Sequence, residues 1–345
     1  MSQSQRRRPR PMTMPIPPAE SPQLQTERLR ADPAGIARAA ALLAAGGLVA
    51  LPTETVYGLA ADARSDLAVA GVFAAKGRPR FNPLIVHLAD AALADQYGVL
   101  DGVARRLAQA FWPGPLTLIV PLRDGHGLSP LVTAGLASVA LRVPAHGTAR
   151  AVLAAFGGPL AAPSANPSGR ISPTTAAHVL AGLDGRIAAV LDGGACGVGV
   201  ESTIIGLTDG VPRLLRAGGL ASEAVEAAMG ARLHPALPVD DTRPTAPGQL
   251  SSHYAPGAAV LLGMRAPRAG VVWVGFGAGC DAADMTLSAS GDLTEAAANL
   301  FATLHRADAL ARSRGAVAIG FAPVPDTGLG RAINDRLSRA AAPRG

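Results

Sequence analysis

The sequence predicts an α/β protein built from a larger and a smaller domain. Short apolar strands alternate with helical segments through most of the chain, which is typical of α/β folds. With 345 residues, the chain is long for a single hydrophobic core. A Pro-rich stretch without periodicity, residues 233–257, separates two alternating regions, 26–232 and 258–345. Residues 1–25 contain an Arg- and Pro-rich run and are expected to be a disordered tail.

Helix start signals and apolar runs place the individual elements. Asp32 followed by Pro33 begins a helix that Gly46 ends, and residues 48–51 then form a buried strand. A second helix start is expected at Ser172, with Pro173 in its first turn. The same patterns predict further strands at 84–88, 116–120, 138–144, 159–163, 203–207, 258–262, 271–275 and 316–320, and helices at 66–75, 90–97, 101–110, 292–312 and 328–340.

Composition and charge limit the functional classes. Aromatic residues are only 3% of the chain, so Ala, Val and Leu must supply the core. The net charge is +6, but four arginines within residues 1–10 leave only +2 for the rest, which is weak support for a nucleic-acid surface. Cys196 and Cys280 are far apart and without metal-ligand spacing, as expected in a reducing cytoplasm. No apolar run reaches the ~20 residues of a membrane helix.

The segment 76–87 carries the strongest local signal. Lys76 is the only lysine in a chain with 30 arginines, and Arg78 and Arg80 follow it. An ammonium is a compact point charge that a guanidinium fork does not replace at a tight phosphate site. Pro79 and Pro83 restrict the backbone and so aim these charges. We interpret the segment as an anion site rather than as a solvated basic turn.

Polar residues collect at several strand ends, where open α/β sheets bind their ligands. Residues 52–59 follow the first buried strand and form either a substrate contact or a Thr-rich turn. Arg142 interrupts an apolar strand, so it must meet either a protein carboxylate or an anionic ligand, and we favour the ligand. His87 ends another strand, a position that is more often structural than catalytic.

Two later segments add candidate contacts. Residues 164–170 are dense in small hydrogen-bond donors and precede a helix start, which suits an anion, although an ordinary turn has the same composition. Asn82 and Asn166 are two of only four asparagines, and both lie in these loops. The Gly-rich residues 191–203 match neither the phosphate-binding loop nor the dinucleotide fingerprint. Trp112 is interpreted as core packing.

Together these motifs resemble one family. Residues 52–59, 76–84 and 164–169, in this order, closely resemble the YrdC-type threonylcarbamoyl-AMP synthases, and residues 201–203 and 215–218 fit as well. The family signature Lys-x-Arg…Ser-x-Asn is met by Lys76, Arg78, Ser164 and Asn166. The resemblance spans roughly residues 27–225. It implies a twisted mixed open sheet with flanking helices and, for the longer branch, a small Rossmann-like C-terminal α/β domain.

The resemblance also implies a reaction and a set of site residues. L-Threonine, bicarbonate (or CO2) and ATP would give L-threonylcarbamoyl-adenylate and pyrophosphate, the first step of threonylcarbamoyladenosine modification of tRNA next to the anticodon. Lys76 and Arg78 are implied as catalytic. Threonine is expected at Thr55, His87, Arg142 and Ser202. The nucleotide is expected at Arg78, Asn82, Ser164, Asn166, Thr174, Arg216 and His253.

Cofactor and partner expectations follow from the same family. Mg²⁺ is expected on the ATP phosphates and mostly water-ligated, because no dedicated carboxylate cage is evident. Downstream proteins would transfer the threonylcarbamoyl group to tRNA, so direct tRNA binding is not required. The stretch around Ser252, His253 and Tyr254 is expected to cover the site, and the role of the C-terminal domain stays open.

Two other functional classes compete with this reading. An RNA-binding assembly factor would explain Lys76, Arg78 and Arg80 but not the hydroxyl- and Asn-rich loops. A carbamoyl-transfer module of hydrogenase maturation would need zinc-finger and acylphosphatase-like segments, for which this chain lacks the cysteines and the length.

Overall fold

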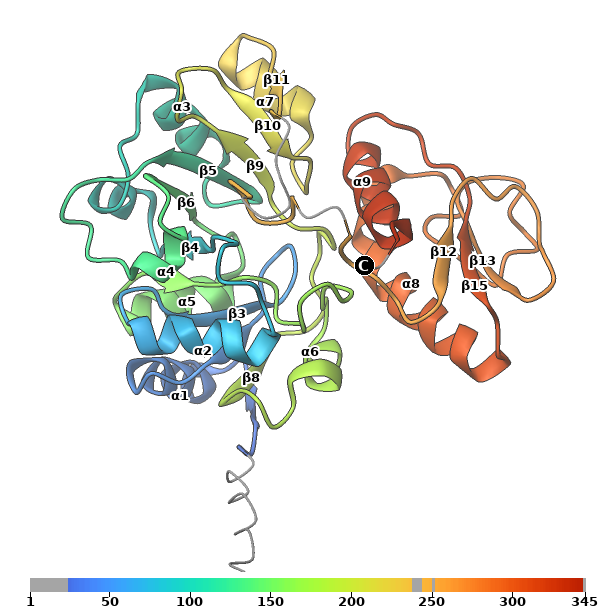
Figure 1. Cartoon of the computed structure of the whole chain (residues 1–345), viewed down its shortest axis with the longest axis horizontal. Coiled ribbons are helices and arrows are strands. Elements are labelled where there is room, and N and C mark those ends of the chain that lie inside the picture. Colours follow the sequence, from blue (N-terminus) through green and yellow to red (C-terminus); the bar gives the residue numbers. More distant parts are fainter. Residues whose placement is uncertain (1–23, 238–243, 250–251, 344–345) are drawn as a thin grey trace, which may run out of the picture.

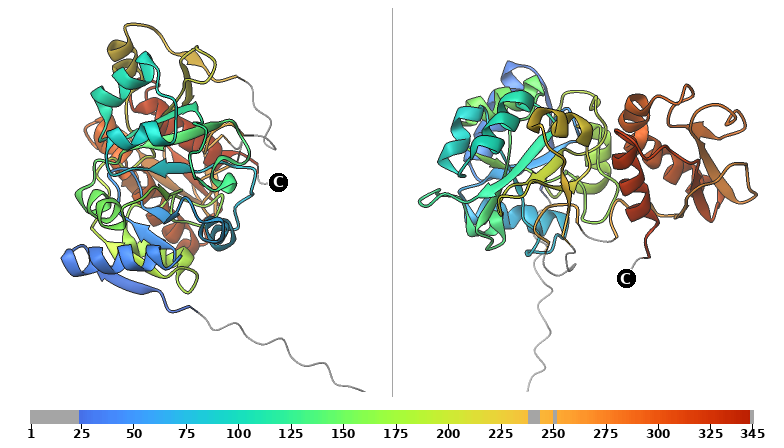
Figure 2. Two further views of the ribbon diagram at one scale, coloured as in Figure 1. Left: turned by 90° about the vertical axis from the view of Figure 1, so that its left-hand side faces the viewer. Right: turned by 90° about the horizontal axis from the view of Figure 1, so that it is seen from above.

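The computed structural model describes residues 24–237, 244–249 and 252–343. These residues form an N-terminal domain around one large sheet and a C-terminal domain around a small sheet (Figure 1). The two domains lie side by side in Figure 1 and in the right-hand view of Figure 2. The predicted fold, a mixed open sheet followed by a smaller Rossmann-like α/β domain, is confirmed. The predicted tail lies outside the described residues, except for its last two positions.

The large sheet has eleven described strands in the order β1-β8-β2-β3-β7-β4-β6-β5-β9-β10-β11. Parallel and antiparallel pairs alternate irregularly: β4 runs parallel to β6, for example, and β5 runs antiparallel to it. The strands are β1 (Glu27–Arg30), β2 (Val49–Leu51), β3 (Gly58–Asp62), β4 (Ile85–His87), β5 (Leu116–Pro121), β6 (Ser138–Arg142), β7 (Leu160–Ala161), β8 (Ala189–Asp192), β9 (Thr203–Gly206), β10 (Arg213–Arg216) and β11 (His234–Pro235).

Five of the seven described α-helices of this domain begin where a capping side chain accepts a hydrogen bond from the backbone. Asp32 caps the first helix by accepting from the Gly35 amide at 2.8 Å, as predicted. The helices are α1 (Pro33–Ala44), α2 (Asp66–Lys76), α3 (Gly102–Phe111), α4 (Pro130–Thr133), α5 (Gly147–Phe156), α6 (Ala176–Leu183) and α7 (Ser222–Met229). The predicted helix at 90–97 is a 3₁₀ helix, η1 (Ala91–Gln96).

One predicted helix start is wrong. Helix α6 is capped by Thr175, which accepts from the His178 amide, and not by Ser172. The carbonyl of Pro173 accepts from the Tyr57 amide, and the carbonyl of Thr174 accepts from the Cys196 amide. The backbone after Ser172 is therefore used to join neighbouring loops, and the helix begins three residues after Pro173. Among the described elements of this domain, strands β1, β3, β8 and β11 and helices α4 and α7 were also not predicted.

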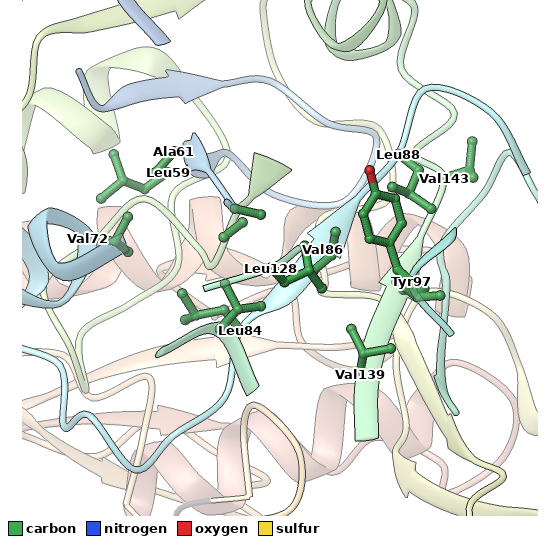
Figure 3. Packing of buried hydrophobic residues seen from close by; sticks show 14 of the residues in the cluster. Leu59, Ala61, Val72, Leu84, Val86, Leu88, Tyr97, Leu128, Val139 and Val143 are labelled. Carbon is green, nitrogen blue, oxygen red and sulfur yellow. The ribbon is translucent and has the colours of Figure 1, made fainter. Parts of the chain in front are cut away.

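The main core packs beneath the large sheet. Leu59 of β3, Val86 of β4 and Leu84, which precedes β4, belong to the same cluster as Val72 of α2. All four residues are almost completely buried (Figure 3). Because aromatic side chains are scarce, this core consists mainly of Leu, Val and Ala. Trp112 is buried and donates from Nε1 to the Leu116 carbonyl at 2.7 Å, which confirms its packing role.

The C-terminal domain has four described strands, all parallel, in the order β12-β15-β13-β14. Its elements are β12 (Ala259–Leu261), β13 (Val271–Gly275), β14 (Met285–Thr286), α8 (Leu293–Arg314), β15 (Ala318–Phe321) and α9 (Gly330–Ala341). Both helices lie on the side of the small sheet that faces the N-terminal domain (Figures 1 and 2). Of the described helices, none combines the length and the hydrophobicity needed to cross a bilayer.

The two domains share one hydrophobic cluster. Val56, Ile171 and Val200, from three loops of the N-terminal domain, belong to the cluster formed around Leu300 and Phe301 of α8. The ring of His178 stacks on that of His305, also in α8, with centroids 3.9 Å apart. The C-terminal domain is thus packed against loops that follow strand ends of the large sheet.

Replacing a leucine by alanine should destabilise the protein much more in the core than on the surface. We expect Leu118→Ala, in the middle of β5 and fully buried, to lower the free energy of unfolding by about 2–5 kcal/mol because it leaves a cavity. Leu67→Ala is the matched control, since Leu67 is 87% exposed on α2. Urea denaturation measures both; equal effects of the two substitutions would contradict this core.

Candidate active site

Residues 52–57 connect β2 to β3 and are held by their own hydroxyls. Thr53 Oγ1 donates to the Val56 carbonyl at 2.6 Å and lies 2.9 Å from Thr55 Oγ1. Tyr57 donates from its hydroxyl to the Gly194 carbonyl at 2.7 Å, which ties the loop to the Gly-rich segment. This fixes Thr55 at the end of the buried strand, where a ligand contact was predicted.

Helix α2 delivers Lys76 and Arg78 to the same region. Gly77 adopts a left-handed conformation with φ of 59°, which ends the helix and turns the chain. Arg78 Nη2 donates to Asn82 Oδ1 at 2.6 Å and to the Pro83 carbonyl at 2.9 Å. The predicted Asn82 therefore orients Arg78. Burial, together with the charge of Arg216, lowers the pKa of Arg78 to about 10, so it remains a cation at neutral pH.

The ammonium of Lys76 is buried and used by the protein itself. Its Nζ donates to the backbone carbonyls of Ser164 and Asn166. Burial, reinforced by the charge of Arg78, lowers the pKa of Lys76 well below its ordinary value. Lys76 thus fixes the loop 164–166 against the end of α2.

Strands β4 and β6 place His87 beside Arg142 in register. Arg142 Nη2 donates to Glu54 Oε1 at 2.6 Å, so in this structure the arginine meets a protein carboxylate, the alternative that we did not favour. Glu54 Oε2 and His87 Nδ1 are buried and have no hydrogen-bond partner among the described residues. Burial and the charge of Arg142 lower the pKa of His87 to about 3, so its imidazole is neutral.

Ser202 and Arg216 form the opposite wall. Arg216 donates from Nη2 to the carbonyl and the hydroxyl of Ser202, at 2.9 and 3.1 Å. Thr117 Oγ1 lies 2.7 Å from Ser202 Oγ and fixes that hydroxyl from β5. Arg216 Nη1 also reaches the Pro247 carbonyl at 3.3 Å. The wall from β9 and β10 is therefore joined to the segment between the domains.

The segment between the domains covers the site. Ala255 donates its amide to the Gly169 carbonyl at 2.8 Å, and His253 and Tyr254 are buried, with Tyr254 at the unusual φ of 61°. Burial lowers the pKa of His253 to about 3, and the nearby cations Arg78 and Lys76 act in the same direction. His253 is consequently neutral and faces the same hollow as the arginines.

These walls enclose a narrow hollow of about 50 Å³. It brings together eight of the predicted residues: Thr55, Arg78, His87, Arg142, Ser164, Ser202, Arg216 and His253. Four predicted residues do not line it. Lys76 and Asn82 act through neighbours, Asn166 lines a separate hollow next to His178, and the Thr174 hydroxyl lies 3.4 Å from His178 Nδ1.

Sequence reasoning gave no separate role to several residues of this hollow. Glu201 lines it and accepts from Ser172 Oγ at 2.6 Å and from Arg336 Nε at 2.9 Å. Tyr254, Pro247 and Gly248 line it from the covering segment. Tyr254 belongs to the stretch that the sequence predicted to cover the site, although not as a separate contact, whereas nothing local in the sequence marks Arg336 as a partner of Glu201.

The charge balance of the hollow favours an anion. Glu201, which lines the hollow, is paired with Arg336, and Glu54, which precedes the lining residue Thr55, is paired with Arg142. Within the described part of the chain, neither Arg78 nor Arg216 has a carboxylate within ion-pair distance, although both are buried. Glu201 also acts on Arg216, but it is shared with Arg336, so the carboxylates near the hollow do not balance its buried guanidiniums. This excess of positive charge is costly unless a ligand supplies negative charge.

Fold and hollow together define an α/β protein with a buried, arginine-lined site for an anionic ligand. Two family models match the chain: the Sua5/YciO/YrdC model, described as "Telomere recombination", over residues 41–218, and "Threonylcarbamoyl-AMP synthase, C-terminal domain" over residues 220–342.

Curated relatives agree over nearly the whole length. The chain is 43% identical to the threonylcarbamoyl-AMP synthase of Bacillus subtilis, covering 92% of this chain and 96% of the relative. It is 40% identical to that of Pyrococcus abyssi, covering 88% and 93%. The crystal structure of P. abyssi Sua5 complexed with L-threonine superposes with a TM-score of 0.82 at 39% identity, covering 92% of this chain and 97% of that one. The chain therefore belongs to the threonylcarbamoyl-AMP synthase family and contains both of its domains.

The Glu54–Arg142 pair should make stability depend on pH. Burial would raise the pKa of Glu54, but the charge and hydrogen bond of Arg142 outweigh it, and the pKa lies below its ordinary value of 4.5. A carboxyl that is more acidic in the folded state stabilises the fold above its unfolded pKa, and this contribution is lost as the pH falls through the folded pKa. We expect Glu54→Gln to weaken the decline in stability below about pH 4.5.

At pH 7, the same substitution should lower the free energy of unfolding by about 3–5 kcal/mol, because Arg142 is left buried and unpaired. Glu27→Gln is the control: it breaks an exposed pair with Arg38 and should leave the unfolding midpoint nearly unchanged. Urea titrations between pH 3 and pH 7 measure both effects. A Glu54→Gln protein as stable as the wild type at pH 7 would show that the pair is not needed.

Proposed function

We propose that this chain condenses L-threonine, bicarbonate (or CO2) and ATP into L-threonylcarbamoyl-adenylate with release of pyrophosphate, the first step of tRNA threonylcarbamoyladenosine formation. The observation that carries this is the convergence of Arg78 and Arg216, buried without carboxylate partners among the described residues, on a hollow that also contains His87 and Arg142. Family membership supplies the reaction, and the excess of positive charge at the hollow suits the two reacting species, the threonine carbamate and ATP, which are both anionic.

The chemistry needs positioning more than a nucleophile. The amine of threonine takes up CO2 to give a carbamate, and a carbamate oxygen then attacks the α-phosphorus. The new O–P bond forms as the bond from the α-phosphorus to the bridging oxygen breaks, and pyrophosphate leaves with that electron pair. Guanidiniums that face the phosphates stabilise the charge that develops in this step. We assign this role to Arg78 and Arg216.

The threonine end is proposed at Thr55, His87, Arg142 and Ser202. Arg142 offers a planar fork that matches a carboxylate, and Glu54 holds that fork in place through one of its amino groups. The neutral imidazole of His87 has an unpartnered Nδ1 that a polar substrate group can meet. The threonine complex of the Pyrococcus relative supports a threonine site in this fold.

The nucleotide end is proposed at Arg78, Ser164, Arg216 and His253, with Asn82 orienting Arg78. Asn166 and Thr174 stay in this set as a prediction of the family motif, on the side of the neighbouring hollow. Lys76 is proposed to act by holding the loop 164–166, through the backbone carbonyls of Ser164 and Asn166.

ATP needs more room than the hollow of about 50 Å³ offers, since sites for ligands of this size measure roughly 300–1,000 Å³. Residues 245–249 contribute to the walls of two hollows: Pro247 and Gly248 line this one, and Thr245 and Gln249 line another of about 490 Å³. Ala246 of this segment packs on Ile119 and Ile204 of the sheet. We propose that ATP displaces the segment and occupies both hollows.

Mg²⁺ is proposed to arrive on the ATP phosphates. The residues of the hollow do not fit a protein-held ion, because Glu54 and Glu201 are each bonded to an arginine. In the described part of the chain, no group of three or more His, Cys, Asp or Glu residues has metal-binding geometry. The downstream partners are proposed to be proteins that transfer the threonylcarbamoyl group to tRNA, without tRNA contact by this chain.

Pyrophosphate release from ATP tests the reaction. With the purified full-length protein, we expect release to require both L-threonine and bicarbonate, because the carbamate is the attacking group. Omission of either substrate is the control. Release that is indifferent to threonine would contradict the proposed function.

Lys76→Ala is expected to reduce this release by about 100-fold or more, because the loop 164–166 loses its anchor beside Arg78. Circular dichroism should show an unchanged fold, since the partners of Lys76 are neutral carbonyls. Arg80→Ala is the matched control: Arg80 is a cation of the same turn, is exposed, and should be dispensable. Near-normal turnover of Lys76→Ala would remove Lys76 from the machinery.

A further inference from the structure

Helix α9 of the C-terminal domain places a completely buried arginine against the active-site hollow. Arg336 is 0% exposed, and its Nε donates to Glu201 Oε2 at 2.9 Å. Glu201 lines the hollow, and its other oxygen is held by Ser172. Burial would raise the pKa of Glu201, but the charges of Arg336 and Arg216 outweigh it and the pKa is lowered, so the carboxylate stays ionised.

The same guanidinium touches two more walls of the hollow. Its Nη1 donates to the carbonyl of Ala217, the residue next to Arg216. Its Cζ lies 5.5 Å from the ring centroid of Tyr254, in cation–π distance. Tyr254 is held at a positive φ and packs on His253, with ring centroids 4.1 Å apart. One side chain therefore joins the segment that leads into β9, the end of β10 and the covering segment.

We propose that Arg336 is a positioning residue of the active site, through which the C-terminal domain sets the geometry of the nucleotide-binding wall. This inference rests on the proposed function and gives the C-terminal domain a role in it. By fixing Glu201 and Ala217, Arg336 fixes the neighbouring Ser202 and Arg216. By packing against Tyr254, it fixes His253 over the hollow. Of the proposed threonine contacts, only Ser202 adjoins this network, and its hydroxyl is also fixed by Thr117 of β5. Thr55, His87 and Arg142 lie on other elements.

The same helix supplies a matched control. Arg331 also crosses from α9 to the N-terminal domain, where its Nη1 lies 2.8 Å from Glu223 Oε1 and 2.6 Å from Ser222 Oγ. This pair is well exposed, with side-chain exposures of 39% and 48%, and neither residue lines the hollow. Arg331→Ala therefore removes a contact between the domains without touching the site.

The experiment compares Arg336→Met, Arg336→Lys and Arg331→Ala in the full-length protein. Calorimetry gives Kd for ATP and for L-threonine, and pyrophosphate release gives kcat and KM, all at a temperature at which circular dichroism shows the proteins folded. We expect Arg336→Met to raise Kd and KM for ATP by about 10-fold or more, and those for threonine by less than about 3-fold.

Arg336→Lys is included in case Arg336→Met does not fold. Its ammonium keeps a positive charge beside Glu201, so the carboxylate is not left buried without a counter-charge. It lacks the fork that reaches Ala217 and the plane that packs on Tyr254, so we expect an intermediate loss of ATP affinity. Arg331→Ala should change ATP binding by less than about 2-fold. A purely structural defect would reduce the active fraction and leave the ratio of the two Kd values unchanged.

Three outcomes would overturn the proposal: wild-type ATP affinity in a folded Arg336→Met or Arg336→Lys protein, an equal loss for ATP and threonine, or an equal loss in Arg331→Ala. Failure of the proposed function is separate, because it would appear as threonine-independent pyrophosphate release in the wild type. The ATP-binding comparison reports on Arg336 even then.

Discussion

The structure depends on a buried imbalance of charge. Arg78 and Arg216 face one hollow, and the two carboxylates that line or border it are already committed to Arg142 and Arg336. A protein interior tolerates unpaired cations only when fixed dipoles or a bound anion compensate them. Here the carbonyls of Asn82, Pro83 and Ser202 provide partial compensation, and in the proposed function a bound triphosphate supplies the rest. This requirement explains why so many polar loops converge on one point of a Leu- and Val-rich fold.

Nearby residues in the sequence were enough to predict most of the helices and strands and the polar segments that form the site. Asp32-Pro33 predicted a helix start that the structure confirms, and the sole lysine, followed by Pro79 and Pro83, predicted a shaped turn. The pairings that complete the site are not local. Glu54 meets Arg142 across 88 positions, and Glu201 meets Arg336 across 135 positions. Periodicity and capping carry no information about such contacts, which is why Arg142 was assigned to a ligand and Arg336 to no role.

The misplaced helix start illustrates the same limit. Ser172-Pro173 has the chemistry of a cap, and local preference alone favours it. Neighbouring loops use the hydrogen-bonding groups of this segment instead. The Tyr57 amide donates to the Pro173 carbonyl, and the Ser172 hydroxyl donates to Glu201. Tertiary contacts thus override a good local signal at a place where loops of both domains meet. Such a conflict between local preference and tertiary structure is typical of functional sites, where the backbone is shaped for ligand binding rather than for the most favourable secondary structure.

The central claim, that the two arginines without carboxylate partners among the described residues receive the triphosphate, is tested most directly by a crystal structure with L-threonine and a non-hydrolysable ATP analogue. The account predicts guanidinium nitrogens of both Arg78 and Arg216 within about 3 Å of phosphate oxygens. A triphosphate bound elsewhere, with Arg78 still donating only to Asn82 and Pro83, would contradict it.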